Sequence, residues 1–491
     1  MLTRLRVKGF KNLVDVDVRF GQFTCIAGPN GAGKSNLFDA IAFLGDLASM
    51  PIMKAASRAR GTNGRISDFH SLFFKNSKDE FSPMVFIAEM IVPRNVIDDF
   101  DRAARPTATF LEYTLELRLS ETHADLSSAD PIYIEREELR AINASEAAKH
   151  LGFTPAVAWI KKHIFGPGPR RTAFISTNTD PKINPSQPAI RLFGDQTKKG
   201  GPPFLVPARK SPQTIVSGAN SSSHPTALAA RSELRSWRLL QLEPSALRRL
   251  DNFGDDPHIT SIGEHLPGAL MRIDNYAEVS QRLSQLLPDI VSVNVDADEK
   301  RKTKTVLLAM KDKETYTASS LSDGTLRFMA LAVLALDSEF GGLLCMEEPE
   351  NGIHPSRIPQ MLDLVRSLSE DIEADGDDPT TPSIRQLIIN THSPLVVAEL
   401  RDDELLFAET LKLKTKSFVN FKALPKTWRH AASGAKGAEL ITRGEILSYL
   451  SGSKRSPRSV ERADLVGRLA ESPPDILQRL ATPDLFQQAQ L

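Results

Sequence analysis

Eight consecutive residues near the N-terminus have the types and spacing of a phosphate-binding loop. The run Gly28-Pro29-Asn30-Gly31-Ala32-Gly33-Lys34-Ser35 fits the P-loop pattern G-x-x-x-x-G-K-S. Glycines without a Cβ let successive backbone N–H groups close around phosphate oxygens. Lys34 would reach the β- and γ-phosphates, and the Ser35 hydroxyl would bind Mg²⁺. The residues expected to contact a nucleoside triphosphate are Gly28, Asn30, Gly31, Ala32, Gly33, Lys34, Ser35 and Asn36.

The flanking sequence supplies the elements that such a loop requires. An apolar run, residues 23–27, predicts a strand that leads into the loop. Leu37, Ile41, Leu44 and Leu47 recur at helical spacing after it. The positive end of that helix would point at the phosphates. A glycine-rich turn without a ligand is the alternative, and the strand and helix on either side argue against it.

A second group of acidic and polar residues follows two apolar runs near residues 343 and 387. The run 343–346 predicts a buried strand that ends in Glu347, Glu348 and Glu350. The run 387–389 predicts another strand, which ends in Asn390-Thr391-His392. Acidic groups at the carboxyl end of a central strand would lie beside the metal site, as in a Walker B motif. A solvated turn and a structural histidine are the alternatives.

Ser322, Asp323 and Gly324 precede an apolar helical run, residues 328–336. Ser and Asp commonly cap helices, so a simple helix N-cap is one reading of this turn. The order of the motifs, with this turn between a P-loop and a Walker-B-like strand, favours a functional reading.

The motifs, taken in order, resemble those of ABC-type ATPase heads of the SMC/RecF class, and more closely ATPases related to OLD (overcoming lysogenisation defect) proteins, many of which act in anti-phage systems. The motifs that carry the resemblance are residues 5–13, the P-loop, residues 321–327, residues 347–355 and residues 391–394. The resemblance covers residues 1–50 and 320–410, and the middle of the chain only loosely. It implies an α/β fold of the P-loop NTPase type: an ABC-ATPase head with a mixed central sheet, a flanking antiparallel sheet and a helical insertion.

The resemblance also implies a role for each motif residue. ATP and Mg²⁺ would be the ligands, with Lys34 on the phosphates and Ser35 and Glu347 on the metal. Glu348 would be the general base, and His392 the switch histidine that contacts the γ-phosphate. Ser322, Asp323 and Gly324 would form the signature that meets the nucleotide of a second protomer. Residues 351–354 would lie in the loop that crosses the dimer interface.

The sequence departs from the family pattern in two places, and the family's roles are not assigned to this chain there. The usual Q-loop glutamine has no assigned position, because no glutamine occurs between Gln22 and Gln187. OLD-type nucleases also carry a TOPRIM domain after the switch histidine. The residues that follow His392 here contain no apolar strand ending in Asp-x-Asp. We therefore expect any nuclease activity to belong to a separate partner chain.

The composition indicates which partners and which cellular compartment suit the protein. The 491 residues contain 61 basic and 61 acidic side chains, so no global charge steers the chain onto nucleic acid or membrane. Cys25 and Cys345 are the two cysteines of the chain, which suits a reducing compartment. No apolar run is long enough to span a bilayer, and the N-terminus does not resemble a signal peptide. We expect a cytoplasmic protein that does not contact membrane.

Changes in composition predict four regions. We expect an N-terminal ATPase lobe over 1–140, a helical and irregular insertion over 141–300, and a C-terminal ATPase lobe over 301–410. An extension and polar tail would occupy 411–491. The tail could be solvated or could dock a partner. The insertion carries scattered basic residues, which favours a solvated segment over a dedicated nucleic-acid groove.

The sequence leaves several functions to compare. The first is an ATP-driven switch that forms a homodimer or higher oligomer and controls a separate effector, such as a nuclease, in anti-phage defence. The second is a RecF- or SMC-like repair ATPase that acts on DNA directly; nucleic acid could also be bound through a partner. The third is a slow ATPase that serves as a nucleotide sensor or scaffold. Transporter subunits place their signature much closer to the P-loop, which argues against that class.

Overall fold

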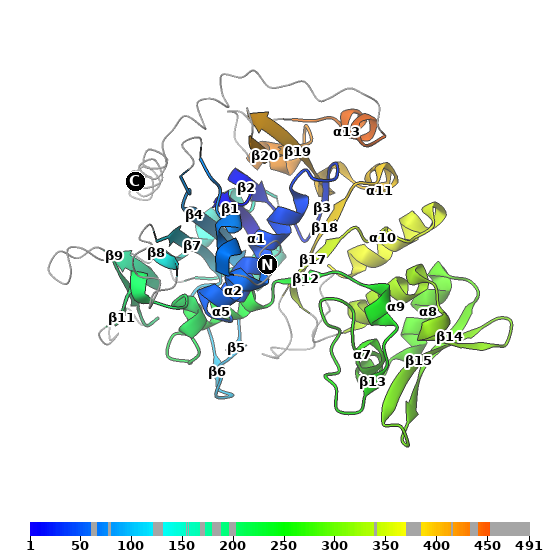
Figure 1. Cartoon of the computed structure of the whole chain (residues 1–491). Helices are drawn as coiled ribbons and strands as arrows, with labels where there is room; N and C mark the ends of the chain where they lie inside the picture. Colours follow the sequence, from blue (N-terminus) through cyan, green and yellow to red (C-terminus); the bar gives the residue numbers. More distant parts are fainter. Residues whose placement is uncertain are drawn as a thin grey trace.

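The P-loop helix α1 (Lys34–Leu47) packs against side chains of two different β-sheets, and this position fixes the direction of the phosphate-binding loop. The protein is described by a computed structural model (Figure 1). The described residues are 1–59, 66–76, 80–120, 131–153, 155, 157–166, 172–178, 188–195, 203–337, 341–369, 384–413, 416–432 and 440–451.

The central sheet is mixed, as the sequence predicted. Its six strands lie in the order β12, β17, β18, β3, β19 and β20. Neighbours are parallel from β12 to β19, and β20 pairs antiparallel with β19. The carboxyl ends of the parallel strands meet at one edge of the sheet, which is where ligands bind in such folds. The strands are β12 (Arg238–Leu240), β17 (Gly342–Glu347), β18 (Arg385–Thr391), β3 (Phe23–Ala27), β19 (Leu405–Leu413) and β20 (Lys416–Ala423).

The second large sheet is antiparallel and has eight strands. Their order is β11, β10, β9, β8, β7, β4, β1 and β2. The ranges are β1 (Leu2–Phe10), β2 (Leu13–Arg19), β4 (Met84–Ile91), β7 (Phe110–Leu119), β8 (Ile132–Ala141), β9 (Ile175–Asn178), β10 (Ala189–Leu192) and β11 (Phe204–Pro207). A short hairpin, β5 (Val96–Ile97) with β6 (Ala103–Ala104), projects from this part of the molecule (Figure 1).

A smaller lobe lies to the lower right in Figure 1, beside the end of the central sheet that begins with β12. Its sheet contains β13 (Asp251–Asn252), β14 (Ile290–Asp298), β15 (Thr303–Met310) and β16 (Thr315–Thr317). Helices α7 (Leu266–Ile273) and α8 (Tyr276–Leu286) pack on this sheet, and α9 (Asp323–Leu336) packs against both of these helices. Its apolar side chains form one core with one face of the central sheet.

Alternation along the central strands divides the core in two. Ile26 of β3 packs in the cluster that contains α1, while Cys25 and Ala27 pack in the cluster that contains α9. The aromatic rings of Phe10 and Phe43 stack at 5.7 Å between β1 and α1. The other helices are α2 (Ile52–Arg58), α3 (Ala147–Leu151), α4 (Val157–His163), α5 (Pro225–Arg235), α6 (Pro244–Leu247), α10 (Ile358–Ser367), α11 (Pro394–Glu399), α12 (Trp428–Ala432) and α13 (Arg443–Leu450).

The four regions expected from composition stay a prediction, and their bounds can be compared with the strands. The segment 141–300 contributes β9, β10 and β11 to the antiparallel sheet and β12 to the central sheet. The expected boundary at 300 falls inside the β14–β15 hairpin, and the boundary at 410 falls inside β19. Turn-rich composition marks the loops between strands as readily as it marks linkers between domains. The tail after 451 lies outside the described residues. Among the described helices, none has the length and apolarity needed to cross a membrane.

Candidate nucleotide site

The P-loop connects β3 to α1 with the backbone that its glycines permit. Gly31 has φ of 76° and Gly33, the N-cap of α1, has φ of 102°. A Cβ on Gly28 would lie 2.3 Å from the Ala408 carbonyl oxygen, so β19 leaves room for glycine alone. The first turn of α1 holds no acidic residue, so the positive end of the helix is not neutralised there. These features fit a triphosphate.

Lys34 lies inside the curve of the loop. Its Nζ donates to the carbonyl oxygens of Gly28 at 2.6 Å and Pro29 at 2.9 Å. Burial lowers the pKa of Lys34, and the nearby carboxylates of Glu348 and Glu350 oppose that shift. The ammonium group is therefore held close to the end of the Walker-B-like strand.

The opening motif of the sequence supports the loop from outside. Nδ2 of Asn36 donates to Oδ1 of Asn12 at 2.7 Å, and Asn12 also lies where a Cβ on Gly33 would be. The Lys11 ammonium pairs with the Asp39 carboxylate at 2.7 Å. The turn between β1 and β2 thus contacts the first two turns of α1. A hollow of about 570 Å³ lies beside it and includes Ser35 in its lining.

The paired glutamates follow β17, as predicted. Glu347 is the last residue of β17 and pairs in register with Asn390 of β18. Glu348 follows with φ of 45°, a conformation that costs free energy for a non-glycine residue and is found preferentially at functional sites. Its backbone N–H donates to the carbonyl oxygen of Asn390 at 3.2 Å.

Both carboxylate oxygens of Glu348 are engaged. Oε1 lies 2.9 Å from Nδ1 of His392, and Oε2 accepts from Nδ2 of Asn351 at 2.7 Å. His392 and Glu348 are 40% and 28% exposed, so the pair remains accessible to a ligand and a water molecule. The structure therefore brings together the expected base and the expected switch histidine.

One cavity of about 350 Å³ joins the P-loop to the Walker-B-like strand. Ser35 lines it from one side, and Glu347 and Glu348 from the other. A hydroxyl and a carboxylate facing one cavity are ligands of the kind that Mg²⁺ binds. The complete lining is Ser35, Gln241, Leu242, Glu243, Arg327, Leu331, Met346, Glu347, Glu348, Pro349, Asn351 and Asn390.

Sequence reasoning missed Gln241. Its Nε2 donates to Oε2 of Glu347 at 2.6 Å, directly after β12, the neighbour of β17. Gln241 lines the same cavity as Ser35 and Glu348, on the edge where the other motifs lie. The signal was present: Gln241 ends a short apolar run, residues 239–240, but it lies beyond the interval in which a glutamine was sought.

Glu350 is a second group that the motif assignment did not use. Its side chain is buried, Oε1 accepts from the Thr391 hydroxyl at 2.5 Å, and Oε2 has no hydrogen-bond partner among the described residues. Burial raises the pKa of Glu350. The Thr391 hydroxyl in turn accepts from the backbone N–H of Ser393 at 3.0 Å, so Glu350 helps to hold the loop that carries His392.

The turn that contains Ser322, Asp323 and Gly324 does not line this cavity. Ser322 caps α9 by accepting from the Thr325 N–H at 3.2 Å. A Cβ on Gly324 would lie 3.0 Å from the Gly352 carbonyl oxygen, so the turn packs against the loop that follows Glu348. Neither Ser322, Asp323 nor Gly324 is among the described residues that line the cavity with Ser35.

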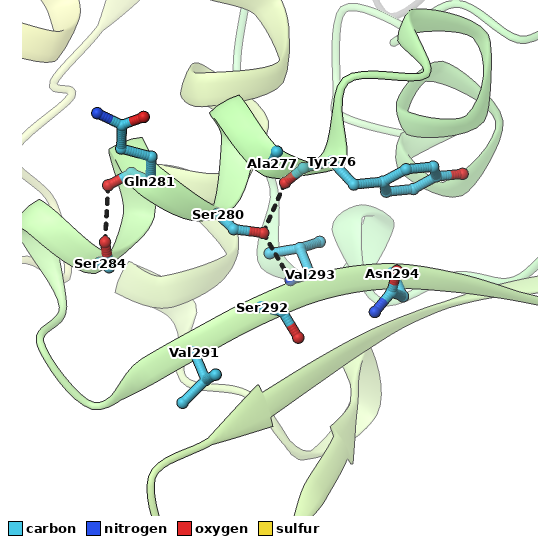
Figure 2. A pocket seen from close by; sticks show the side chains of 9 residues that line it. All are labelled: Tyr276, Ala277, Ser280, Gln281, Ser284, Val291, Ser292, Val293 and Asn294. Atoms are coloured by element: carbon cyan, nitrogen blue, oxygen red, sulfur yellow. Dashed lines mark hydrogen bonds between the residues drawn. The ribbon is translucent and has the colours of Figure 1, made fainter.

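Two other features of the smaller lobe, a hollow and a cluster around Asp251, have side chains that bond to the neighbouring backbone. The hollow of about 450 Å³ between α8 and β14 is lined by nine described residues, none of them an acid, a base or a thiol (Figure 2). The Ser280 hydroxyl there donates to the Tyr276 carbonyl oxygen and accepts from the Val293 N–H. Asp251, His265 and Asp255 lie close enough together to hold a metal ion. One carboxylate oxygen of Asp251 accepts a hydrogen bond from the Gly268 N–H at the start of α7.

Two family models and one curated relative match parts of this chain. A family model described as "AAA domain, putative AbiEii toxin, Type IV TA system" matches residues 190–398, and one described as "RecF/RecN/SMC N terminal domain" matches residues 1–60. The OLD nuclease of Thermus scotoductus is 52% identical over 48 residues, which are 10% of this chain and 9% of that protein.

Similar solved structures are heads of SMC proteins. An SMC head bound to the C-winged helix domain of ScpA is 16% identical, with a TM-score of 0.43 and coverage of 87% of this chain and 99% of that one. The SMC head domain from Thermotoga maritima is 12% identical, with a TM-score of 0.36 and coverage of 85% and 98%. The two family models, the local identity to the OLD nuclease and the order of the motifs support an ABC-type ATPase of the SMC/RecF/OLD-like class.

Proposed function

We propose that the protein is an ATP-binding and ATP-hydrolysing switch that dimerises head to head on ATP and controls a separate effector. The observation that carries the proposal is Glu348, whose carboxylate is held by His392 and Asn351 beside the cavity that Ser35 and Glu347 line. A fixed carboxylate within reach of a phosphate site is what general-base hydrolysis requires.

Each residue of the cavity has a role in this proposal. Lys34 and the P-loop N–H groups bind the phosphates, and Ser35 and Glu347 hold Mg²⁺, with Gln241 orienting Glu347. Bound Mg²⁺ neutralises charge on the phosphate oxygens. Glu348 orients the attacking water and accepts its proton.

The remaining groups complete the composite site. His392 contacts the γ-phosphate from the same protomer. Ser322, Asp323 and Gly324, which do not line the cavity of their own chain, contact the nucleotide of the second copy, as the resemblance to ABC-type heads implies. ATP then joins two chains as well as being their substrate, and hydrolysis separates them.

The effector is proposed to be a separate nuclease in anti-phage defence. The match to the AAA model that names an AbiEii toxin and the local identity to an OLD nuclease support this setting. Cys25 and Cys345 are buried free thiols, which supports placing the protein in the cytoplasm. The experiment is to purify the protein with its genomic neighbours and to measure ATP turnover and DNA cleavage. A nuclease that co-purifies and whose cleavage depends on ATP supports the proposal; turnover without any associated effector contradicts the effector part.

A second function has its own support. The match of residues 1–60 to the RecF/RecN/SMC model favours an ATPase that acts on DNA directly. Salt-dependent binding of the isolated protein to duplex DNA would identify this function. An isolated protein that hydrolyses ATP and leaves DNA unbound at low salt would exclude it.

A further inference from the structure

Arg248 ties helix α6 to the signature turn. Its Nη2 donates to the Leu321 carbonyl oxygen at 2.9 Å and to Oδ1 of Asp323 at 2.6 Å. The Arg248 and Asp323 side chains are 30% and 55% exposed. An exposed ion pair contributes little to the stability of a fold. The ion pair between Arg248 and Asp323 is therefore expected to add little to the free energy of unfolding.

The carboxylate of Asp323 is a problem for the proposed interface. It lies between Ser322 and Gly324, in the turn that meets the triphosphate of the second copy. An uncompensated carboxylate there would repel the phosphate oxygens. The positive end of α9 offsets part of this charge. Arg327, one turn along the helix, also attracts Asp323, but its Nη1 is bonded to the Asn351 carbonyl oxygen.

We propose that Arg248 is a positioning residue of the composite nucleotide site: it fixes the signature turn and cancels the charge of Asp323, so that the turn can approach the phosphates bound by a second copy. This inference rests on the proposed function. It assigns to Arg248 an effect on dimerisation that is separate from the ATP site of its own chain, whose cavity it does not line.

The placement of Arg248 adds a second consequence. At one end of the segment 241–248, Gln241 contacts Glu347 in the cavity for the chain's own nucleotide. At the other end, Arg248 contacts Leu321 in the turn that is proposed to meet the second copy. One short segment therefore touches both half-sites to which a protomer contributes.

A double-mutant cycle tests the charge argument. Arg248→Ala, Asp323→Asn and the double variant are made in a Glu348→Gln background, which keeps ATP bound. Arg249→Ala is the matched control, because Arg249 is the next residue and pairs with Glu264 away from the turn. The measured quantity is the dimer dissociation constant with ATP and Mg²⁺, by sedimentation velocity. Nucleotide titration of the monomer and thermal melting are recorded for each variant.

We expect Arg248→Ala to weaken dimerisation about tenfold, because the unpaired Asp323 carboxylate then repels the phosphates through solvent. The double variant should dimerise more tightly than Arg248→Ala, because it lacks the unpaired carboxylate and loses only the bond to the Leu321 carbonyl oxygen. Arg249→Ala should match the background protein. The loss should shrink in high salt, since the screening length falls from about 10 Å at 0.1 M to about 3 Å at 1 M.

Three outcomes would contradict the inference, and they are separable. Equal weakening in Arg248→Ala and in the double variant would make Arg248 a structural tether without an electrostatic role. Unchanged dimerisation of Arg248→Ala would remove the role altogether. A background protein that binds ATP and stays monomeric would overturn the head-to-head function and this inference together.

Discussion

Nδ1 of His392 lies 2.9 Å from Oε1 of Glu348, across the gap between the ends of two parallel strands. The second oxygen of the same carboxylate is held by Asn351 at 2.7 Å. Two loops therefore fix one side chain, whose backbone has φ of 45°. A general base acts efficiently only when its carboxylate is held in the orientation that the attacking water requires, and these two contacts hold Glu348 in one orientation.

Glu348→Gln should lower the rate of ATP hydrolysis by about 10² to 10⁴-fold, because the amide cannot accept the proton of the attacking water. The shape of the site and the contact with Asn351 are retained, so ATP binding should persist and ATP-bound dimers should accumulate. Steady-state turnover and sedimentation in ATP measure both effects. Glu314→Gln, in the turn before β16, is the control. Undiminished turnover in Glu348→Gln would show that another group is the base.

Asn351→Ala should lower kcat about tenfold and leave the KM for ATP unchanged, because it frees one oxygen of Glu348 without removing a phosphate contact. His392→Ala should change both constants, since the histidine is expected on the γ-phosphate. Initial-rate measurements over a range of ATP concentrations separate the two patterns. If the two variants behave alike, the separate roles given to Asn351 and His392 are incorrect.

Gln241→Ala should raise the Mg²⁺ concentration needed for half-maximal turnover by about tenfold or more. Its amide orients Oε2 of Glu347, and loss of such an outer contact commonly weakens a metal site by that factor. Titration of turnover with Mg²⁺ at saturating ATP tests this. Gln281→Ala, on the hollow between α8 and β14, is a matched control that should match the unmodified protein. An unchanged Mg²⁺ requirement would separate Gln241 from the metal.

Gly28→Ala should destabilise the protein by about 1–3 kcal/mol, the usual cost of inserting a methyl group into packed surroundings. The added Cβ would lie 2.3 Å from the Ala408 carbonyl oxygen, so β19 or the P-loop must shift. Thermal melting and nucleotide titration should both report the change. Gly254→Ala is the control, because its Cβ would meet nothing within 4 Å. Equal melting temperatures would mean that β19 moves without cost.

Glu137 makes stability depend on pH. Its buried carboxylate accepts from the N–H groups of Ile215 and Val216 and from the Tyr113 hydroxyl, yet burial raises its pKa from 4.5 to about 7. Between those values the native state keeps a proton that the unfolded state has lost, so the free energy of unfolding falls as pH rises. The contribution is complete below pH 4.5 and lost above about pH 7.

Denaturant unfolding of the unmodified protein and of Glu137→Gln between pH 5 and 8 measures this contribution. The unmodified protein should lose about 2–3 kcal/mol relative to the variant as pH rises through that range. A constant difference between the two proteins at every pH would show that Glu137 is ionised throughout.

Local sequence was sufficient for the motifs and for the strands that carry them. Each motif follows a short apolar run and is itself polar: this holds for the P-loop, for the glutamates at the end of β17 and for the histidine after β18. The length of an apolar run and the spacing of its apolar residues are enough to predict such a strand or helix. The resemblance to ABC-type ATPase heads implied a mixed central sheet beside an antiparallel one, which the strand order confirms. The expected region boundaries stay predictions, and the one at residue 300 falls inside the β14–β15 hairpin.

The sequence by itself determined which residue types could hold phosphate, metal and water, because those demands are met by side-chain chemistry at fixed local spacing. Tertiary structure alone decided which groups meet. Gln241 reaches Glu347 because β12 lies beside β17, and Arg248 reaches Asp323 because α6 packs against α9. Such pairs are far apart in the chain, and only the order of strands and the packing of helices brings their atoms within hydrogen-bond distance.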